Sequence, residues 1–420
     1  MRILVVGSGG REHALAWKLS QEAEVHVAPG NPGIAEDAKL HPVAASDFPA
    51  LISLAKQLSV DLVVVGPENP LIEGLADALR AEGIPTFGPS AADSRLEGSK
   101  AFSKALMREA RIPTAEFQTF TESGTAREYA RDMFQKGRPV VIKASGAALG
   151  KGVIVCSDVE DAERAISSMI DDNEFGGAGS TIVVEERLRG PEFSLLTLCS
   201  GERHLSLPVA QDYKRAYEKD EGPNTGGMGS YSPVPWISTD LIARTEAEVV
   251  APVLRSLKGS QYRGLLFSGL MVQDGKPYCL EYNVRFGDPE TQSVMMRLGN
   301  GFAAALLACA KGEQIPEVEV LLNHSVCVVV ASAHYPGDVT KGIPIDLPAT
   351  LPPNAKIFHA GTALRDGQLV TNGGRVFGVT ASGETAEEAR EAAYALAKKI
   401  EFDGAWYRSD IALQPAGIRA

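Results

Sequence analysis

The segment LEYNVRFGDPETQ, from Leu280 to Gln292, crowds acidic, amide and basic side chains into one short stretch. It is preceded by Asp274-Gly275, a pair of residues that favours a tight hairpin turn between two strands. We therefore expect strands over Gly264–Val272 and Lys276–Asn283, paired antiparallel. The charged segment then begins on the second strand of a hairpin and continues into a turn.

The alternation of side chains along this strand predicts a chemical site on one of its faces. Glu281 and Asn283 would share a face, and their oxygens suit a hard cation such as Mg²⁺, which takes one or two protein ligands beside phosphates and waters. Arg285 would remain on that side and grip a transferring phosphoryl group. The full expectation places Tyr278, Leu280 and Tyr282 on one face and Cys279, Glu281 and Asn283 on the other. The alternative is a surface ion-pair cluster.

The composition is that of a soluble globular protein with several domains. The chain has 420 residues, of which 44% are hydrophobic and 22% charged, and this length suggests roughly three domains. Its 41 Lys and Arg against 53 Asp and Glu give a net charge of −12, which disfavours nonspecific binding to nucleic acid or to an anionic membrane.

Cysteine usage and hydropathy predict a cytoplasmic protein. The five cysteines are dispersed without metal-binding spacing and are expected to be buried and reduced. The N-terminal apolar run is too short for a signal peptide, and the longest apolar stretch, Phe302 to Ala310, is too short to cross a bilayer.

Alternating patterns divide the chain into three regions. The first hundred residues alternate strands (3–6, 25–28, 62–65) with helices (11–19, 74–82), which predicts a parallel sheet with helices on both faces. The middle region has strands at 139–143, 152–156 and 181–185 and a helix at 158–170. The last region has strands at 326–332, 356–360 and 375–380 and an amphipathic helix at 385–400.

The turn GSGGREHAL, from Gly7 to Leu15, lies between the first strand and the first helix. Glycines at a helix N-terminus predict an anion site built from backbone N–H groups. A dinucleotide would require a glycine where the chain has Glu12, and an acid after the second strand where it has VAPGNPG. A phosphate site and a turn that only packs helix against strand remain the two interpretations.

The segment KASGAALGKGVIV, from Lys143 to Val155, predicts a glycine loop within a hairpin. It is not a Walker A loop, because Lys151 is followed by glycine and a strand follows the loop. Such a loop could fold over a triphosphate, and Lys143 at its base would need an anion to offset its desolvation. The alternative is an ordinary hairpin whose lysine reaches solvent.

Two further segments predict binding functions. In VVEERLRGPEFS, the strand ending at Glu185 and running on to Leu188 could offer backbone groups and a carboxylate to an adenine edge, with Glu192 near a ribose. In QDYKRAYEKDEGPNTGGMGSYSP, a lysine–arginine pair precedes GPNTGGMG, which is too rich in glycine for regular structure and predicts a binding loop.

Together these residues resemble the ATP-grasp ligases, and among them the phosphoribosylamine–glycine ligases. The resemblance covers essentially the whole chain and rests on these motifs: GSGGREHAL, VAPGNPG, VVGPENPL, LEGSKAFSK, QDYKR, GPNTGGMGSYSP, RFGDPETQ and VTNGGRVF. It implies an α/β and α+β multidomain fold with a Rossmann-like pre-ATP-grasp domain (1–103), a two-part ATP-grasp domain (104–325, with a mobile subdomain at about 119–190) and a small C-terminal α+β domain (326–420).

The resemblance also implies a reaction and assigns residues to it. ATP would phosphorylate glycine, and the amine of 5-phosphoribosylamine would attack the glycyl phosphate in a monomeric enzyme of purine synthesis that needs Mg²⁺ or Mn²⁺. ATP would contact Lys104, Lys143, Gly150, Lys151, Gly152, Glu185, Leu188 and Glu192, and the metal Glu281 and Asn283. The expected catalytic residues are Arg285 and Asp288, and the expected substrate-binding residues are Gly9, Gly10, Glu68, Asp212, Lys214, Asn224, Gly226, Gly227 and Glu290.

The chain departs from the family pattern at two places. Ser145, Ala147 and Leu149 alter the glycine loop, which leaves its phosphate contacts open. The strand Gly264–Val272 lacks the acid that many ATP-grasp enzymes carry there, which leaves the number of metal ions open. Competing functions are another ATP-grasp ligase with a nucleotide substrate, an NAD-dependent oxidoreductase, and a nucleotide-binding protein without turnover.

Overall fold

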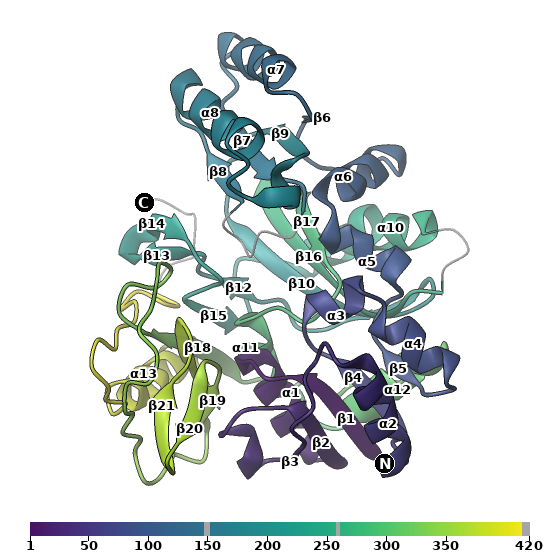
Figure 1. Cartoon of the computed structure of the whole chain (residues 1–420), viewed down its shortest axis with the longest axis vertical. Coiled ribbons are helices and arrows are strands. Elements are labelled where there is room, and N and C mark those ends of the chain that lie inside the picture. The colour runs from purple at the N-terminus through teal and green to yellow at the C-terminus, as the bar shows by residue number, and fades with distance from the viewer. Residues whose placement is uncertain (147–151, 258–260, 414–420) are drawn as a thin grey trace.

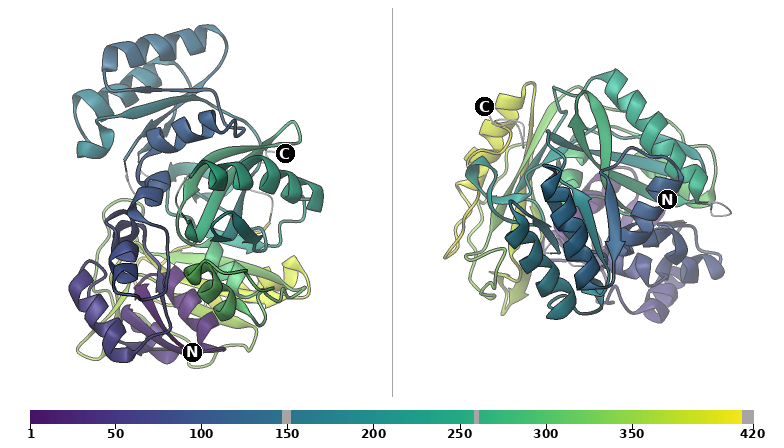
Figure 2. Two further views of the ribbon diagram at one scale, coloured as in Figure 1. Left: turned by 90° about the vertical axis from the view of Figure 1, so that its right-hand side faces the viewer. Right: turned by 90° about the horizontal axis from the view of Figure 1, so that it is seen from above.

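The computed structural model describes residues 1–146, 152–257 and 261–413. In Figure 1 the N-terminal part (purple) and the C-terminal part (green to yellow) lie at the bottom, and a subdomain drawn in blue stands above them. The other two views agree with this arrangement (Figure 2). The chain therefore forms a broad base with one subdomain projecting from it.

The N-terminal part is a parallel sheet with helices on both faces, as predicted. Its strands are β1 (Arg2–Gly7), β2 (Glu24–Pro29), β3 (Lys39–Leu40), β4 (Leu62–Val65) and β5 (Thr86–Phe87), in the order β3-β2-β1-β4-β5. Its helices are α1 (Gly10–Ser20), α2 (Phe48–Leu58), α3 (Glu68–Ile72) and α4 (Leu75–Ala81). Leu4 and Val6 enter the core with α2 and α4, whereas Ile3 and Val5 enter a second core with α1 and a later helix, α12 (Phe302–Lys311). A helix from the middle of the chain thus completes the N-terminal fold.

Two antiparallel sheets follow the helices α5 (Ala91–Gly98) and α6 (Lys100–Glu109). The projecting subdomain holds the order β6-β9-β7-β8, formed by Phe117–Phe120, Ile182–Glu186, Val140–Ala144 and Val153–Val155, with α7 (Ser123–Gln135) and α8 (Val159–Ile166). This subdomain has a hydrophobic core of its own. The second sheet has the order β11-β10-β16-β17, formed by Arg203–Ser206, Glu192–Ser200, Arg263–Gln273 and Lys276–Asn283. The helices α9 (Thr239–Thr245) and α10 (Ala251–Ser256) precede β16.

The C-terminal sheet recruits strands from the middle of the chain. Its order is β12-β15-β18-β22-β19, formed by Gln211–Asp212, Gly229–Ser232, His324–Ala331, Arg375–Gly383 and Ala355–His359. The remaining elements here are α11 (Glu290–Met295), α13 (Ala386–Ala397) and the hairpins β13–β14 (Arg215–Tyr217, Glu221–Asn224) and β20–β21 (Thr362–Arg365, Gln368–Thr371). The segment from Gln211 to Ser232, which carries several of the expected substrate-binding residues, therefore contributes the strands β12 and β15 to the C-terminal sheet.

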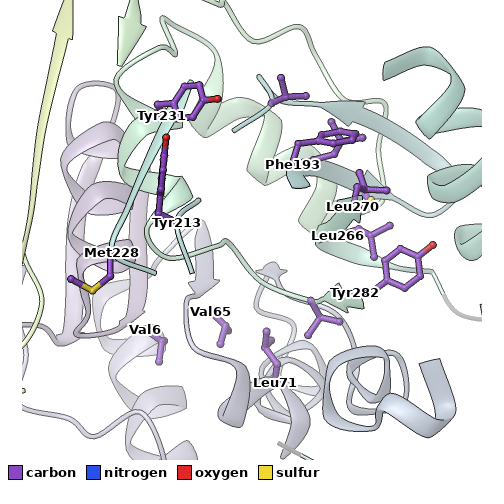
Figure 3. Close-up of a cluster of buried hydrophobic side chains, with 14 of the residues drawn as sticks. Val6, Val65, Leu71, Phe193, Tyr213, Met228, Tyr231, Leu266, Leu270 and Tyr282 are labelled. Carbon is purple, nitrogen blue, oxygen red and sulfur yellow. The ribbon is translucent and has the colours of Figure 1, made fainter. Parts of the chain in front are cut away.

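One hydrophobic cluster joins the N-terminal sheet to the middle region. Figure 3 shows Val6 and Leu71 of the N-terminal part in the same cluster as Phe193 and Tyr282 of the β10–β17 sheet. Continuous apolar packing of this kind resists separation of the parts, because separation would expose the shared core to water.

Two expectations from the sequence, the hairpin turn and the buried cysteines, are confirmed. The predicted hairpin turn is present, with Asp274 and Gly275 both at positive φ (52° and 69°). All five cysteines are buried and free. Within the described residues, no helix is long and apolar enough to span a membrane.

The expectation that GPNTGGMG lacks regular structure is wrong in part. Gly222, Pro223 and Asn224 belong to β14, and Gly229 begins β15, so only the residues between these strands form a connection. Pairing of β14 with β13 and of β15 with β18 stabilises these strands, although their glycine-rich sequence has little intrinsic preference for regular structure.

Candidate functional site

A cavity of about 550 Å³ lies where the projecting subdomain, the β10–β17 sheet and the C-terminal part converge. Its charged and amide lining brings together most of the residues expected from the sequence. These residues are Glu68, Lys104, Lys143, Asp212, Lys214, Asn224, Glu281, Asn283, Arg285, Asp288 and Glu290. Glu97, Lys100 and Arg375 also line the cavity and were not among the site residues predicted from the sequence.

The strand β17 presents Glu281 and Asn283 to the cavity, but not by simple alternation. Asn283 pairs with Phe267 and Glu281 with Gly269, after which the register shifts so that Cys279 pairs with Leu270. Leu280 is the extra residue of this bulge. The expectation that Cys279 shares a face with Glu281 is therefore wrong, and Cys279 lies in the hydrophobic core instead.

The oxygens of Glu281 and Asn283 fit a metal ion. Neither side chain has a hydrogen bond or ion pair within residues 1–146, 152–257 and 261–413, although both line the cavity. Burial by itself raises the pKa of Glu281, but nearby cations, Lys214 foremost, bring it below its usual value, so the carboxylate stays ionised. The described residues contain no group of three or more acidic, histidine or cysteine side chains that could hold a metal, and an ion at Glu281 and Asn283 would take its other ligands from phosphates and waters.

The two expected lysines meet one carboxylate. Glu185 lies 2.5 Å from Lys143 Nζ and 2.6 Å from Lys104 Nζ, and all three side chains are buried. Lys104 Nζ also donates to Thr114 Oγ1 at 2.6 Å. Burial alone raises the pKa of Glu185, but Lys143 and Lys104 bring it below the usual value. The carboxylate expected at an adenine edge is thus already used to neutralise the lysines.

Lys100 is a functional candidate that the sequence reasoning missed. It is the first residue of α6, it lines the cavity, and its side-chain ammonium has no hydrogen bond or ion pair among the described residues. Burial lowers its pKa, while Glu281 acts in the opposite direction. A lysine at the positive end of a helix dipole is unfavourable unless an anion is near, and this signal was present in LEGSKAFSK.

Ser145, a departure from the family pattern, fastens β7 to the start of α6. Its carbonyl accepts from the Lys100 amide at 2.7 Å, and its Oγ accepts from the Ala101 amide at 3.0 Å. Of the glycine loop that follows, Ala147, Leu149, Gly150 and Lys151 lie outside the described residues. Gly152 is described, and its carbonyl accepts from the Ala144 amide at 2.8 Å.

Arg285 is held by two carboxylates from the N-terminal half of the chain. Its Nη2 lies 2.7 Å from Glu97 Oε1, and its Nε lies 3.3 Å from Glu68 Oε2. The Nε–H group makes no hydrogen bond within the described residues. The guanidinium is thus positioned while retaining donor capacity for a ligand.

Asp288 anchors the turn after Arg285. It pairs with Arg375 at 3.3 Å and accepts from Gln292 Nε2 at 2.9 Å. Arg375 Nη1 also donates to the Gly226 carbonyl at 2.6 Å, which ties the glycine-rich connection to this turn. Arg375 lies in the motif VTNGGRVF, but its role was not predicted from the sequence.

The expected substrate loop has its own charge cluster. Lys214 pairs with Glu192 and lies 3.7 Å from Asp212, while Glu290 accepts from Ser194 Oγ at 2.9 Å. Burial, with Glu290 and Glu192 nearby, raises the pKa of Asp212 to about 7 despite Lys214. Gly227 has a φ of 108°, and a Cβ there would lie 2.4 Å from Pro289 Cδ, so this position requires glycine.

The glycine turn before α1 explains why the dinucleotide interpretation fails. The Gly9 amide donates to Glu12 Oε2 at 2.6 Å, and Glu12 is buried beside Arg11. The side chain of Glu12 packs against two glycines, Gly7 and Gly66. A Cβ on either glycine would lie within 2.6 Å of Glu12. A carboxylate therefore occupies this part of the turn, and only the amides after Gly9 remain for a substrate anion.

The chain matches three family models in succession. They are described as phosphoribosylglycinamide synthetase N domain (residues 1–97), ATP-grasp (A) domain (98–291) and C domain (325–414). Phosphoribosylamine–glycine ligases from Vibrio parahaemolyticus and Escherichia coli are each 46% identical over 98% of this chain, covering 97% and 98% of their own lengths. A crystal structure of the enzyme from Thermotoga maritima has a TM-score of 0.85 at 38% identity, covering 98% of this chain and all of that one.

More distant structures share the fold alone. Biotin carboxylase from Campylobacter jejuni has a TM-score of 0.74 at 16% identity, covering 96% of this chain and 92% of that one. At 16% identity, this similarity shows a shared fold and says nothing about shared substrates.

Proposed function

The chain belongs to the phosphoribosylglycinamide synthetase family, and from that premise we propose how its residues divide the work of the reaction. Its activity is that of a phosphoribosylamine–glycine ligase of purine biosynthesis, which joins glycine to 5-phosphoribosylamine using ATP. The observation that carries the proposal is the pair Glu281 and Asn283, whose side chains have no partner in the part of the chain that the structure describes and line one cavity with buried lysines.

The proposed pathway has a glycyl phosphate intermediate. A free carboxylate is a poor electrophile, so it must be activated before an amine can attack it. In the first step, one carboxylate oxygen of glycine attacks the γ-phosphorus of ATP and ADP leaves. The amine of phosphoribosylamine then attacks the glycyl carbonyl, and phosphate leaves with that oxygen. Exclusion of water protects the acyl phosphate between the two steps.

ATP is placed between the projecting subdomain and the β10–β17 sheet. Lys143 and Lys104 would share their charge between Glu185 and the phosphates, and Lys100 would contribute a further ammonium. Backbone groups from Glu185 to Leu188 would meet the adenine, with Glu192 near the ribose. Gly150, Lys151 and Gly152 complete the proposal as the loop over the phosphates.

Glu281 and Asn283 would hold Mg²⁺, with Mn²⁺ as the alternative ion of similar ligand preference. The ion would neutralise charge on the phosphate oxygens. Gly269, opposite Glu281, has no side chain to offer a second carboxylate, so we propose that β17 supplies the protein ligands. Arg285 and Asp288 would act at the transferring phosphoryl group.

The two remaining substrates are assigned to separate groups of residues. The sugar phosphate would lie at the turn of Gly9 and Gly10, bound by the first-turn amides of α1 that follow Gly9, and Glu68 would meet the ribose. Glycine would lie near the loop that carries the following residues: Asp212, Lys214, Asn224, Gly226, Gly227 and Glu290. We further propose that the enzyme is a monomer and acts in the cytoplasm.

Oxygen transfer tests the intermediate. Glycine labelled with ¹⁸O in its carboxylate is incubated with ATP, Mg²⁺ and phosphoribosylamine, and the released phosphate is examined by mass spectrometry. One labelled oxygen per phosphate is expected. Unlabelled phosphate would rule out glycyl phosphate while leaving the ligase activity itself intact.

A further inference from the structure

We propose that Glu97 is a positioning residue for the ligase reaction, holding Arg285 and the end of the metal-binding strand in place with a single carboxylate. The proposal rests on the function assigned to Arg285 above. Glu97 is the penultimate residue of α5, and its side chain is 10% exposed at the edge of the cavity. Glu97 lies in the motif LEGSKAFSK, but no role was predicted for it from the sequence.

Both oxygens of Glu97 are used, and each has a different partner. Oε1 lies 2.7 Å from Arg285 Nη2, and Oε2 accepts from the Val284 amide at 2.8 Å. Val284 is the first residue after β17, where the ladder to β16 ends at the pair Asn283 and Phe267. Glu97 thus supplies the acceptor that the neighbouring strand no longer provides.

This geometry fixes two functional groups at once. The Val284 amide adjoins the Asn283 carbonyl, so the bond to Glu97 constrains the chain directly after the proposed metal ligands. The ion pair on the next residue sets the direction of the guanidinium. A hydrogen bond to an ionised acceptor, such as that from the Val284 amide to the Glu97 carboxylate, is stronger than one between neutral groups.

The second carboxylate on Arg285 does a different job. Glu68 lies farther away, 3.3 Å from Arg285 Nε, and is shared with Arg11, whose Nη1 lies 3.8 Å from it. Glu68 therefore balances the charge of two guanidinium groups, whereas Glu97 pairs with Arg285 at 2.7 Å and also binds the Val284 amide. An ion pair that merely joined two domains would affect folding, but it would not change turnover separately from substrate binding.

The experiment compares Glu97→Gln, Arg285→Lys and the double variant with wild type by kcat, three KM values and melting temperature. Glu97→Gln keeps an acceptor for Val284 but loses the charge that orients Arg285. We expect kcat to fall about tenfold or more, because small misplacement of a reacting group is costly, with KM for ATP changed less than about threefold. The double variant should lose little beyond the worse single variant, since both changes disable one unit.

Glu22→Gln is the matched control. Glu22 is another N-terminal carboxylate that accepts backbone N–H groups from a distant element, at Gly301, Phe302 and Ala303 of α12. The Glu22→Gln variant should have a lower melting temperature than wild type and an unchanged kcat.

The outcomes separate this inference from the function on which it rests. Loss of kcat in Arg285→Lys alone, or losses that multiply in the double variant, would overturn the role of Glu97 and keep that of Arg285. An unchanged kcat in Arg285→Lys would remove the assigned role of Arg285 and the inference with it. If Glu97→Gln does not fold, Glu97→Asp keeps the charge on a shorter side chain: reduced kcat at a normal melting temperature supports the proposal, and normal kcat overturns it.

Discussion

The cavity brings together two kinds of charged side chain. Some form ion pairs within the protein, and others have no ion pair among the described residues. Lys143 and Lys104 share Glu185, so their cost of burial is offset even without a ligand. Glu281 and Lys100 have no such partner within the described residues, although both line the same cavity. The partnerless groups are those that a metal and a phosphate would satisfy, so substitutions there should affect turnover more than folding.

Glu281→Gln or Asn283→Ala should leave the protein folded and lower kcat by about tenfold or more, as expected for loss of one ligand to an ion that stabilises charge in the transition state. Raised Mg²⁺ should restore part of the activity, because occupancy of a weakened site follows mass action. Initial rates measured across a Mg²⁺ titration, beside a melting curve, provide the check. Turnover near that of wild type at ordinary Mg²⁺ would remove both residues from the metal site.

Lys143→Ala should raise KM for ATP about tenfold or more while lowering the melting temperature only modestly, because a lost charge-assisted contact weakens phosphate binding directly. Glu185 would keep Lys104 at 2.6 Å, so no carboxylate is left buried alone. Lys136→Ala is the control, since this lysine of the same subdomain is 60% exposed and pairs with Asp132 at the surface. An unchanged ATP dependence of the rate would contradict the assignment.

At the scale of elements, α1 begins with a turn whose first donor is already satisfied. The Gly9 amide is bound by Glu12, which is itself held by Arg11. The free first-turn amides that follow point to a site bounded by other elements: a Cβ on Gly10 would lie 2.8 Å from Gln292 Nε2 and 3.5 Å from Ala360 Cβ. Helix α11 and the C-terminal part thus limit what the turn can bind.

Gly9→Ala should raise KM for phosphoribosylamine and leave KM for ATP nearly unchanged. A Cβ there would lie 2.9 Å from Glu12 Oε2 and disturb the turn, and Gly9→Val should act in the same direction with a larger loss of stability. Calorimetric binding of the product, glycinamide ribonucleotide, provides a second readout. Gly124→Ala in α7 is the control, since nothing lies within 4 Å of its added Cβ. Equal effects on all substrates, together with a lower melting temperature, would mean that Gly9 serves packing alone.

At the scale of the whole molecule, buried histidines join the N-terminal and C-terminal parts. His13 contacts Asp37 at 3.1 Å, and its Nδ1 accepts from the His359 amide at 2.8 Å. Burial, with His13 and Lys356 nearby, lowers the pKa of His359 to about 3. The interface therefore depends on the imidazole of His359 remaining uncharged.

The histidine interface should be sensitive to acid. A group with an unfolded pKa of 6.5 and a folded pKa of about 3 stabilises the native state fully above pH 6.5 and loses that contribution as the pH falls. Wild type should lose about 1.4 kcal/mol per pH unit from this group below its unfolded pKa. His359→Gln keeps the backbone bonds to His13 and Asn31, so its stability should fall less steeply between pH 6.5 and pH 4, as measured by denaturant unfolding. Parallel pH profiles would show that His359 does not govern acid stability.

Much of the fold could be predicted because its signals are local. The alternation of apolar strands and helices predicted the parallel sheet, and Asp274-Gly275 predicted the hairpin, since both residues tolerate positive φ. Clustered motifs also predicted most of the charged and amide residues that line the cavity. The assigned roles of those residues and the domain limits remain predictions.

What the sequence by itself determined are features fixed by neighbouring residues: strand and helix periodicity, the turn, and the motifs that carry metal and phosphate chemistry. Only the tertiary structure decided which distant groups meet. Glu97 reaches Val284 across 187 positions, Arg375 reaches Gly226 across 149, and a bulge at Leu280 sends Cys279 into the core. The physical reason is that backbone preference and periodicity act over a few residues, whereas a buried charge finds its partner only after separate faces have packed and excluded water.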